Sequence, residues 1–303
     1  MRFLLTLIGA IAIHGAAAAA CPPAGVTRSE LAELRAAEFE VADHVKRRAL
    51  AIGLVGCLAD RDQELRDDTA SEALRTWIRT YKLDVATLNS LRISQVAAIQ
   101  QPDAAGFAQP FAALVLADLV NADTGKPFLS ESDLAEIVQV GTTYLSGLRD
   151  YRGYDQKEGW RHAVPHTADL LMELAHHRAV GKKDQQRMLG AVATQLYAAG
   201  SQSPPQFYHF SEGSRMARAV FSVAERSDIT TAEWEAWFGA FVITPEERTA
   251  SKPELFARRH NLKSFLMPLY ILLAESKDAG QSERVLPYVA KALKNFERVL
   301  QPM

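Results

Sequence analysis

The sequence predicts an all-α protein, an irregular α-solenoid of HEAT-like helix pairs, with a globular helical bundle as the alternative. Apolar residues recur at helical spacing nearly everywhere, and no run alternates with a period of two long enough for a convincing strand. Glycine and proline fall between the periodic segments, where they interrupt helices. Pairs of helices recur about every 35–45 residues, which is typical of stacked helical repeats. Together these observations favour the solenoid.

The expected helices follow one another along the whole chain. The periodicity places them at residues 29–39, 43–59, 64–81, 84–100, 107–121, 132–149, 164–177, 183–199, 207–225, 232–242, 253–273 and 282–300. The third of them carries the pattern Asp62-x3-Arg66-x3-Ala70-x3-Leu74, which resembles the second helix of a HEAT-type repeat. The other pairs do not align with this one, so the solenoid rests on the spacing of the pairs.

Capping boxes mark the starts of three of these helices. In each, a hydroxyl stands three residues before a glutamate, so that each side chain can bond to a backbone N–H that the helix leaves free. The pairs are Thr230 with Glu233, Thr244 with Glu247 and Ser251 with Glu254. Each box falls where the periodicity independently predicts the start of a helix.

The first residues have the three parts of a secretory signal. Arg2 supplies a positive charge, residues 3–13 are apolar, and Ala18, Ala19 and Ala20 offer small side chains at the cleavage positions. The apolar run is shorter than the roughly 20 residues that span a membrane. We therefore expect residues 1–20 to be a cleaved signal peptide and residues 21–303 to form a single all-helical domain with no transmembrane segment. The protein would then be periplasmic or secreted.

The new N-terminus would fall at Cys21, and two fates are open to it. A lipoprotein signal would acylate Cys21 and anchor the protein to a membrane, but Ala18 is smaller than the residue that such signals usually carry three positions before the cysteine. The alternative, which we favour, is a disulfide between Cys21 and Cys57, since these are the only two cysteines and unpaired thiols tend to join in an oxidising compartment. A reactive Cys57 nucleophile is a third and more distant reading.

The charge of the chain excludes some partners. Loss of the leader removes Arg2 and no acid, so that 34 − 1 = 33 basic residues face 36 acidic ones, a formal charge of −3. This balance gives no reason to expect nucleic-acid binding or a polybasic membrane face.

Three segments resemble an uncharacterised bacterial family, domain of unknown function 2785. They are CLADRDQELRDDTASEALRTWIR (Cys57 to Arg79), FAALVLADLVNADTGKPFLSESDL (Phe111 to Leu134) and LRDYRGYDQKEGWRHAVPHTADLLMELA (Leu148 to Ala175). The last is the most specific, because its glycine, tryptophan and histidine spacing is hard to obtain from helix packing alone. Little specific signal is found beyond about Ala199. The resemblance implies an all-helical, repeat-like domain, and it brings no activity, substrate or catalytic residue.

The third segment holds the residues most able to carry chemistry. On a helix, His162, His166 and Asp169 lie at i, i+4 and i+7 and share one face, which Glu173 and His176 extend. Two imidazoles and a carboxylate suit zinc or a similar divalent metal, with Glu173 as a possible fourth ligand or base.

Two features of the segment weigh against a metal site. Pro165 disfavours helical geometry at the residue before it, so His162 could fall in the preceding turn. The opposite face of the helix, with Val164, Ala168 and Leu171, is apolar, and a solvated amphipathic helix would show the same contrast. A structural or solvated face, a polar binding surface and a metal site therefore all remain open.

The loop before this helix combines arginines, aromatics and glycines. Arg149, Tyr151, Arg152, Tyr154 and Trp160 are residue types that anchor interfaces, although such a loop could equally cap the hydrophobic core. With His162, His166 and Asp169 they form one candidate binding site if the fold brings them to the same side.

Two functions are compatible with these patterns. The favoured one is an exported interaction module, without a cofactor, that binds a protein, a peptide or an envelope component. The alternative is a metal-dependent enzyme of the hydrolase type, using His162, His166 and Asp169 as ligands.

Overall fold

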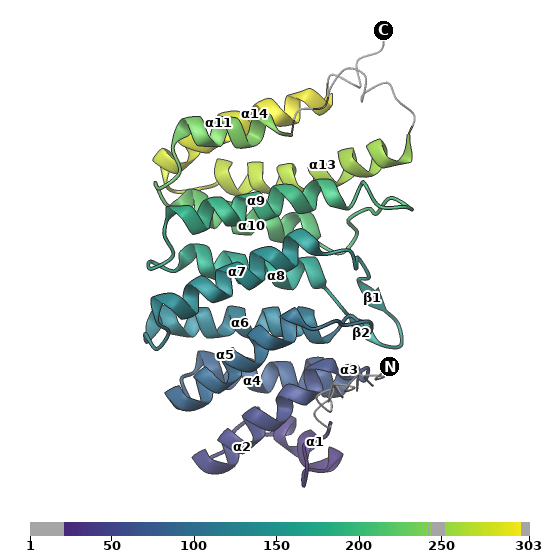
Figure 1. Ribbon diagram of the computed structural model, residues 1–303, viewed down its shortest axis with the longest axis vertical. Helices are drawn as coiled ribbons and strands as arrows, with labels where there is room; N and C mark the ends of the chain where they lie inside the picture. The colour runs from purple at the N-terminus through teal and green to yellow at the C-terminus, as the bar shows by residue number, and fades with distance from the viewer. Residues whose placement is uncertain (1–20, 242, 244–251, 298–303) are drawn as a thin grey trace, which may run out of the picture.

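The computed structural model describes residues 21–241, 243 and 252–297 (Figure 1). The all-helical class is confirmed, since helices make up nearly all of the regular structure in this part of the chain. The signal peptide predicted at residues 1–20 and the capping boxes at Thr244 and Ser251 involve residues outside the described ranges.

The elements occur in the order expected from the periodicity. They are α1 (Arg28–Ala36), α2 (His44–Leu54), the 3-10 helix η1 (Val55–Ala59), α3 (Gln63–Leu65), the π-helical segment η2 (Arg66–Ser71), α4 (Glu72–Arg79), α5 (Val85–Gln100), α6 (Ala108–Gly125), α7 (Glu131–Gly147), β1 (Tyr154–Asp155), β2 (Gly159–Trp160), α8 (Ala163–His176), α9 (Lys182–Ala198), α10 (Glu212–Glu225), α11 (Thr231–Gly239), α13 (Pro253–Ala274) and α14 (Ala279–Glu297). The two strands pair antiparallel.

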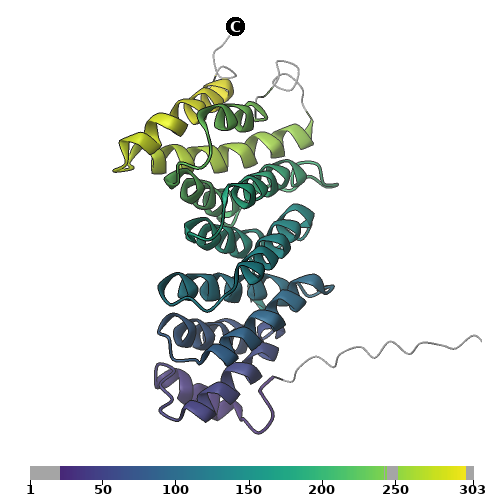
Figure 2. The ribbon, with the colours of Figure 1, turned by 60° about the vertical axis from the view of Figure 1, so that its left-hand side comes forward.

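From α1 to α10 the helices follow one another along the long axis of the molecule in chain order, and α13 then lies on α10 with α11 and α14 beyond it (Figure 1). In one layer α4 packs on α6, α6 on α8, α8 on α10, and α10 on α13, while α2, α5, α7 and α9 pack in succession beside them. Turning the molecule by 60° shows the helices lying side by side along the stack (Figure 2). That the protein is a solenoid rather than a globular bundle stays a prediction. The order of the helices nevertheless decides which of them can contribute to the same site.

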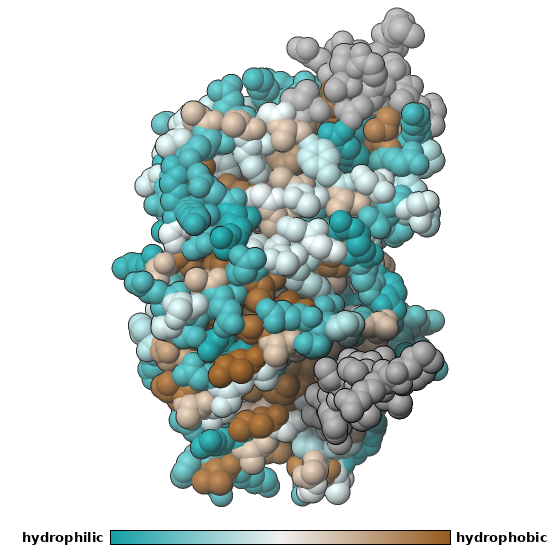
Figure 3. Space-filling view, viewed as in Figure 1, coloured by the Kyte–Doolittle hydropathy of each residue, from teal (hydrophilic) through white to brown (hydrophobic). Residues whose placement is uncertain are grey.

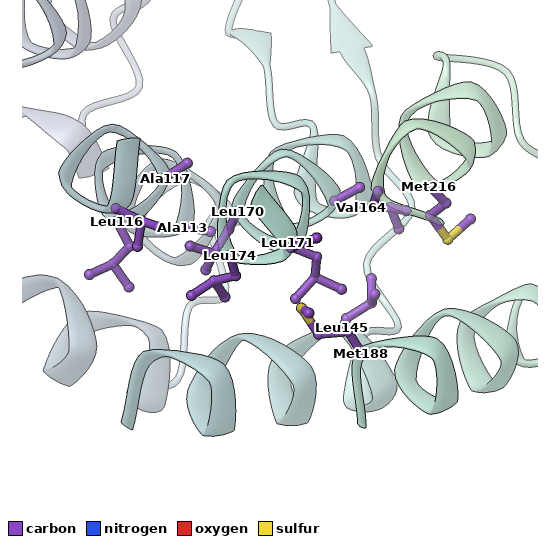
Figure 4. Packing of buried hydrophobic residues seen from close by; sticks show 14 of the residues in the cluster. Ala113, Leu116, Ala117, Leu145, Val164, Leu170, Leu171, Leu174, Met188 and Met216 are labelled. Carbon is purple, nitrogen blue, oxygen red and sulfur yellow. The ribbon is translucent and has the colours of Figure 1, made fainter. Parts of the chain in front are cut away.

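Helix α8 lies in the middle of the first layer. Its apolar face is buried as expected, with Val164 at 2% and Leu171 at 1% exposure. Figure 4 shows residues of α8 packed with Leu116 of α6, Leu145 of α7, Met188 of α9 and other labelled core residues. Burying a side chain of this size contributes about 1.5–3 kcal/mol, so α8 is firmly held and its other face is fixed in position.

Two helix starts show what sequence patterns can and cannot predict. The capping box at Thr230 and Glu233 is confirmed, because the hydroxyl accepts from the Glu233 N–H and the carboxylate accepts from Thr230. The helix expected at 207–225 begins only at Glu212, after Ser211 in a left-handed conformation. The Tyr208 N–H donates to Asn261 Oδ1 of α13, and the Tyr208 carbonyl accepts from His260 Nε2 in place of the N–H four residues on that a helix would supply.

The disulfide between Cys21 and Cys57 is confirmed. The sulfurs are 2.07 Å apart, and the bond joins the start of the described chain to η1, where Cys57 is completely buried. The bond occupies the Cys21 sulfur, the atom that a thioether-linked lipid would require.

The surface carries some apolar side chains at the N-terminal end of the stack. Val45 and Ile52 of α2 and Val85 and Ile93 of α5 are 46–63% exposed, and brown patches are visible over this part of the molecule (Figure 3). Among the helices that the structure describes, none is long and apolar enough to cross a membrane.

Candidate functional site

The polar face of α8 forms the centre of the site. His162 is the N-cap residue, with φ 52° and ψ 39°, and the helix begins at Ala163. Because four residues make about one turn, His162, His166, Asp169 and Glu173 lie above one another on this face. Of the two placements that the sequence left open for His162, within the helix or in the turn before it, the structure has the second.

A cavity of about 400 Å³ opens along this face. Its walls come from η2, α4, α6, α8 and α10 and from Trp160 of β2. We call it the central cavity. Of the predicted site residues, Trp160, His162, His166 and Asp169 line it. Glu173 lines it as well, whereas His176 points elsewhere and pairs with Glu225.

The two imidazoles are neutral and contact aromatic rings. The His162 ring lies 3.9 Å from the Trp160 ring centroid, and the His166 ring meets Phe111 of α6 edge-on at 5.1 Å. Burial, with a smaller contribution from the positive charge of Arg215, lowers the pKa of His162 to about 4. Burial and the neighbouring His162 lower that of His166 to about 3. His162 Nε2 and His166 Nδ1 are buried without a hydrogen-bond partner among the described residues.

The acidic residues of α8 are held by arginines from neighbouring helices. Both oxygens of Asp169 lie 2.7 Å from Nη1 of Arg215 on α10. Arg79 of α4 donates from Nε to Asp118 of α6 at 2.5 Å and from Nη2 to Glu173 at 3.3 Å. Burial raises the pKa of Asp118 to about 6, although Arg79 opposes the shift. The ion pairs thus link four helices around the cavity.

Arg66 of η2 fixes the position of Trp160. Its guanidinium is fully buried and donates to the backbone oxygens of Asp60, Glu158 and Trp160, while Nε donates to Asp67 on the cavity wall. The guanidinium also lies 4.1 Å from the centroid of the Phe107 ring. The π-helical turn that carries Arg66 is an arrangement frequent at functional sites.

The other predicted loop residues hold the loop rather than line the central cavity. Arg149 donates to the Leu148 carbonyl and borders a separate hollow of about 230 Å³. Arg152 pairs with Asp150, and the Tyr151 hydroxyl accepts from Gln195 of α9. Tyr154 is half exposed and packs against Trp160. The eight predicted site residues therefore divide into a cavity group and a loop group.

The geometry offers little for the predicted metal site. The described part of the chain contains no group of three or more histidine, cysteine, aspartate or glutamate residues arranged to hold a metal ion. Asp169 already faces a guanidinium with both oxygens, so the cation beside His162 and His166 is Arg215.

Sequence reasoning missed the residues that complete the site from other helices, namely Arg79, Asp118 and Arg215. Their partners are 39 to 94 positions away in the chain, which no local pattern reveals. Of these three residues, only Asp118 could have been noticed in the sequence, because it stands inside the apolar run FAALVLADLV. A lone acid in such a run is a sign of a buried, paired charge.

The fold and the site define an all-helical protein with a charge-lined cavity between stacked helices. The comparison with family models gives a match over more than half of the chain. Residues 96–271 match the family described as "Protein of unknown function (DUF2785)", and the chain belongs to this family. The match extends beyond Ala199, where the sequence showed little specific signal, and leaves out the segment at Cys57–Arg79. No curated protein and no solved structure matches the chain.

Proposed function

We propose that the protein is an exported binding module and that the central cavity receives a polar segment of its ligand, a protein, peptide or other envelope component. The observation that carries this proposal is the pair of buried ring nitrogens, His162 Nε2 and His166 Nδ1, that have no partner among the described residues. A buried polar atom without a hydrogen bond costs about 1–3 kcal/mol, and a bound ligand would supply the bond.

The surroundings of these nitrogens support binding. Trp160 and Phe111 provide aromatic surface, and the acids and arginines provide fixed hydrogen-bonding groups. The lining is thus mostly charged with some aromatic surface, which suits a polar ligand, and convergent polar groups of this kind fix the orientation of a bound molecule. The leader-like residues 1–20 and the disulfide support an oxidising compartment outside the cytoplasm, and with it a periplasmic partner for a single domain at residues 21–303.

Filling the cavity tests the proposal. Leu114 of α6 lines the cavity and is partly exposed, so Leu114→Trp should block it without disturbing the core. Ile93 of α5 is 59% exposed and outside the cavity, so Ile93→Trp is the matched control. Thermal unfolding is measured with fractions of soluble peptides and envelope fragments from the source organism.

The expected result is a fraction that raises the melting temperature of the wild type and of Ile93→Trp but not of Leu114→Trp. The proposal fails if no fraction stabilises the wild type, or if the stabilisation survives in Leu114→Trp. Elemental analysis of the untagged protein tests the metal alternative, which requires stoichiometric metal that is lost in His166→Ala.

A further inference from the structure

The charged groups of the central cavity are not equally accessible. The side chains of Arg79 and Arg215 are 34% and 38% exposed. Their acidic partners are much more buried, with Asp118 at 3%, Glu173 at 10% and Asp169 at 14%. A ligand entering the cavity therefore meets these two guanidinium groups before their acidic partners. Glu72 of α4, at 50% exposure, is an accessible acid of the same cavity and is paired with Arg75.

The acids that hold the two guanidiniums are neighbours on α8. Arg215 is bound to Asp169 and Arg79 to Glu173, and these two acids are four residues apart on α8. Residues at this spacing have Cβ atoms about 5–6 Å apart. The arginines thus approach the same turn of α8 from α10 and α4.

Each arginine keeps N–H groups that no acid uses. Arg79 bonds its acids through Nε and Nη2, and Arg215 bonds Asp169 through Nη1. Within the described ranges this leaves Nη1 of Arg79, and Nε and Nη2 of Arg215, without a hydrogen-bond acceptor. The ion pairs hold both guanidiniums in place before a ligand binds, which reduces the entropy lost on binding.

We propose that the central cavity binds an oxyanion, a carboxylate or a phosphate group, between Arg79 and Arg215. Guanidinium groups recognise such anions through paired, charge-assisted hydrogen bonds. His162 Nε2 can donate one further hydrogen bond to the anion when that ring nitrogen carries the proton. The charge of Arg75 at the cavity is matched by its partner Glu72. This inference rests on the proposed binding function and names the chemical class of the ligand.

Calorimetric titration of the mature protein tests the inference, with inorganic phosphate in one arm and acetate in the other, at constant ionic strength set by sodium chloride. The decisive variant is Arg215→Gln. Arg187→Gln is the matched control, because Arg187 of α9 is also 38% exposed, is paired with one aspartate and lies outside the cavity. Arg215→Lys keeps the charge, removes the fork of N–H donors and serves as a second variant if Arg215→Gln does not fold.

The wild type and Arg187→Gln should bind at least one of the two anions with equal affinity. Arg215→Gln should bind it at least about tenfold more weakly, since a hydrogen bond to a charged group is worth about 1.5–3 kcal/mol. Binding of acetate alone indicates a carboxylate ligand, and binding of phosphate alone a phosphate ligand.

The inference is overturned if neither anion binds, or if Arg215→Gln binds as well as the wild type. These outcomes are distinguishable from failure of the binding function. An uncharged envelope fragment whose stabilising effect is lost in Leu114→Trp would confirm the cavity as a binding site and refute the oxyanion.

Discussion

Replacing Arg66 by methionine should destabilise the protein more than any surface substitution. The buried guanidinium donates to the carbonyls of Asp60, Glu158 and Trp160 and to the carboxylate of Asp67. Methionine fills much of the space but leaves the carbonyls without donors and Asp67 without its cation. Removing one partner from a buried, charged network costs about 3–5 kcal/mol, and we expect about 4 kcal/mol. Urea unfolding followed by circular dichroism measures the loss.

Arg61→Met is the control for this experiment. Arg61 also bonds to Glu158, but its side chain is 72% exposed, so its loss should leave the free energy of unfolding unchanged within error. Arg66→Lys keeps the charge and should still be destabilised, because an ammonium cannot match the planar fork of donors. If Arg66→Met unfolds within about 1 kcal/mol of the wild type, Arg66 does not hold the Trp160 hairpin and the account of its role is wrong.

Three further predictions concern the cysteines and the cavity. Replacing Cys21 and Cys57 by serine should lower the free energy of unfolding by about 4 kcal/mol, because the bond closes a loop of 36 residues; a loss below about 1 kcal/mol in urea unfolding would contradict this. Intact mass and thiol titration of the exported chain should show Cys21 at the N-terminus without lipid and thiols only after reduction, and a diacylglycerol mass would overturn the assignment. The pKa of His166 in the folded protein, about 3, lies below the 6.5 of a free imidazole, so the wild type should lose stability as pH falls from 6.5. His166→Gln removes the part of this loss that belongs to His166, about 1.4 kcal/mol per pH unit, while His162 keeps its own part; parallel pH profiles of the two proteins would contradict this.

The helices were predictable because the spacing of apolar residues decides them locally. The exceptions are places where distant groups compete with the helix. At residues 207–211 the Tyr208 carbonyl, which a helix would pair with an N–H four residues on, accepts instead from His260 of α13. The π-helical turn at Arg66 interrupts a segment expected to be continuous, and there the side chain bonds to the carbonyls of the hairpin. In both places the group that competes with the helix is far away in the sequence, so no local pattern could reveal it.

The part of the candidate site that lies on α8 could be predicted from the sequence, whereas the part that comes from other helices could not. His162, His166 and Asp169 were recognisable because helical spacing alone places them on one face. Arg79 and Arg215 come from helices whose positions depend on how the layer stacks, and their own sequences look like ordinary solvated faces. The metal hypothesis arose because the stripe on α8 was considered without these arginines.

The position of the cavity also has a mechanical consequence. Its walls come from successive helices of one layer, and the ion pairs from Asp169 to α10 and from Glu173 to α4 cross the joints between them. In the predicted solenoid each unit would contact mainly its neighbours, and bending would occur at such joints. The pairs act as ties across three joints, α4 with α6, α6 with α8 and α8 with α10, so bending the stack changes the separation of Arg79 and Arg215. A ligand that bridges these arginines would make the middle of the molecule harder to bend. A partner that bends the ends of the stack would in turn strengthen or weaken the binding of that ligand.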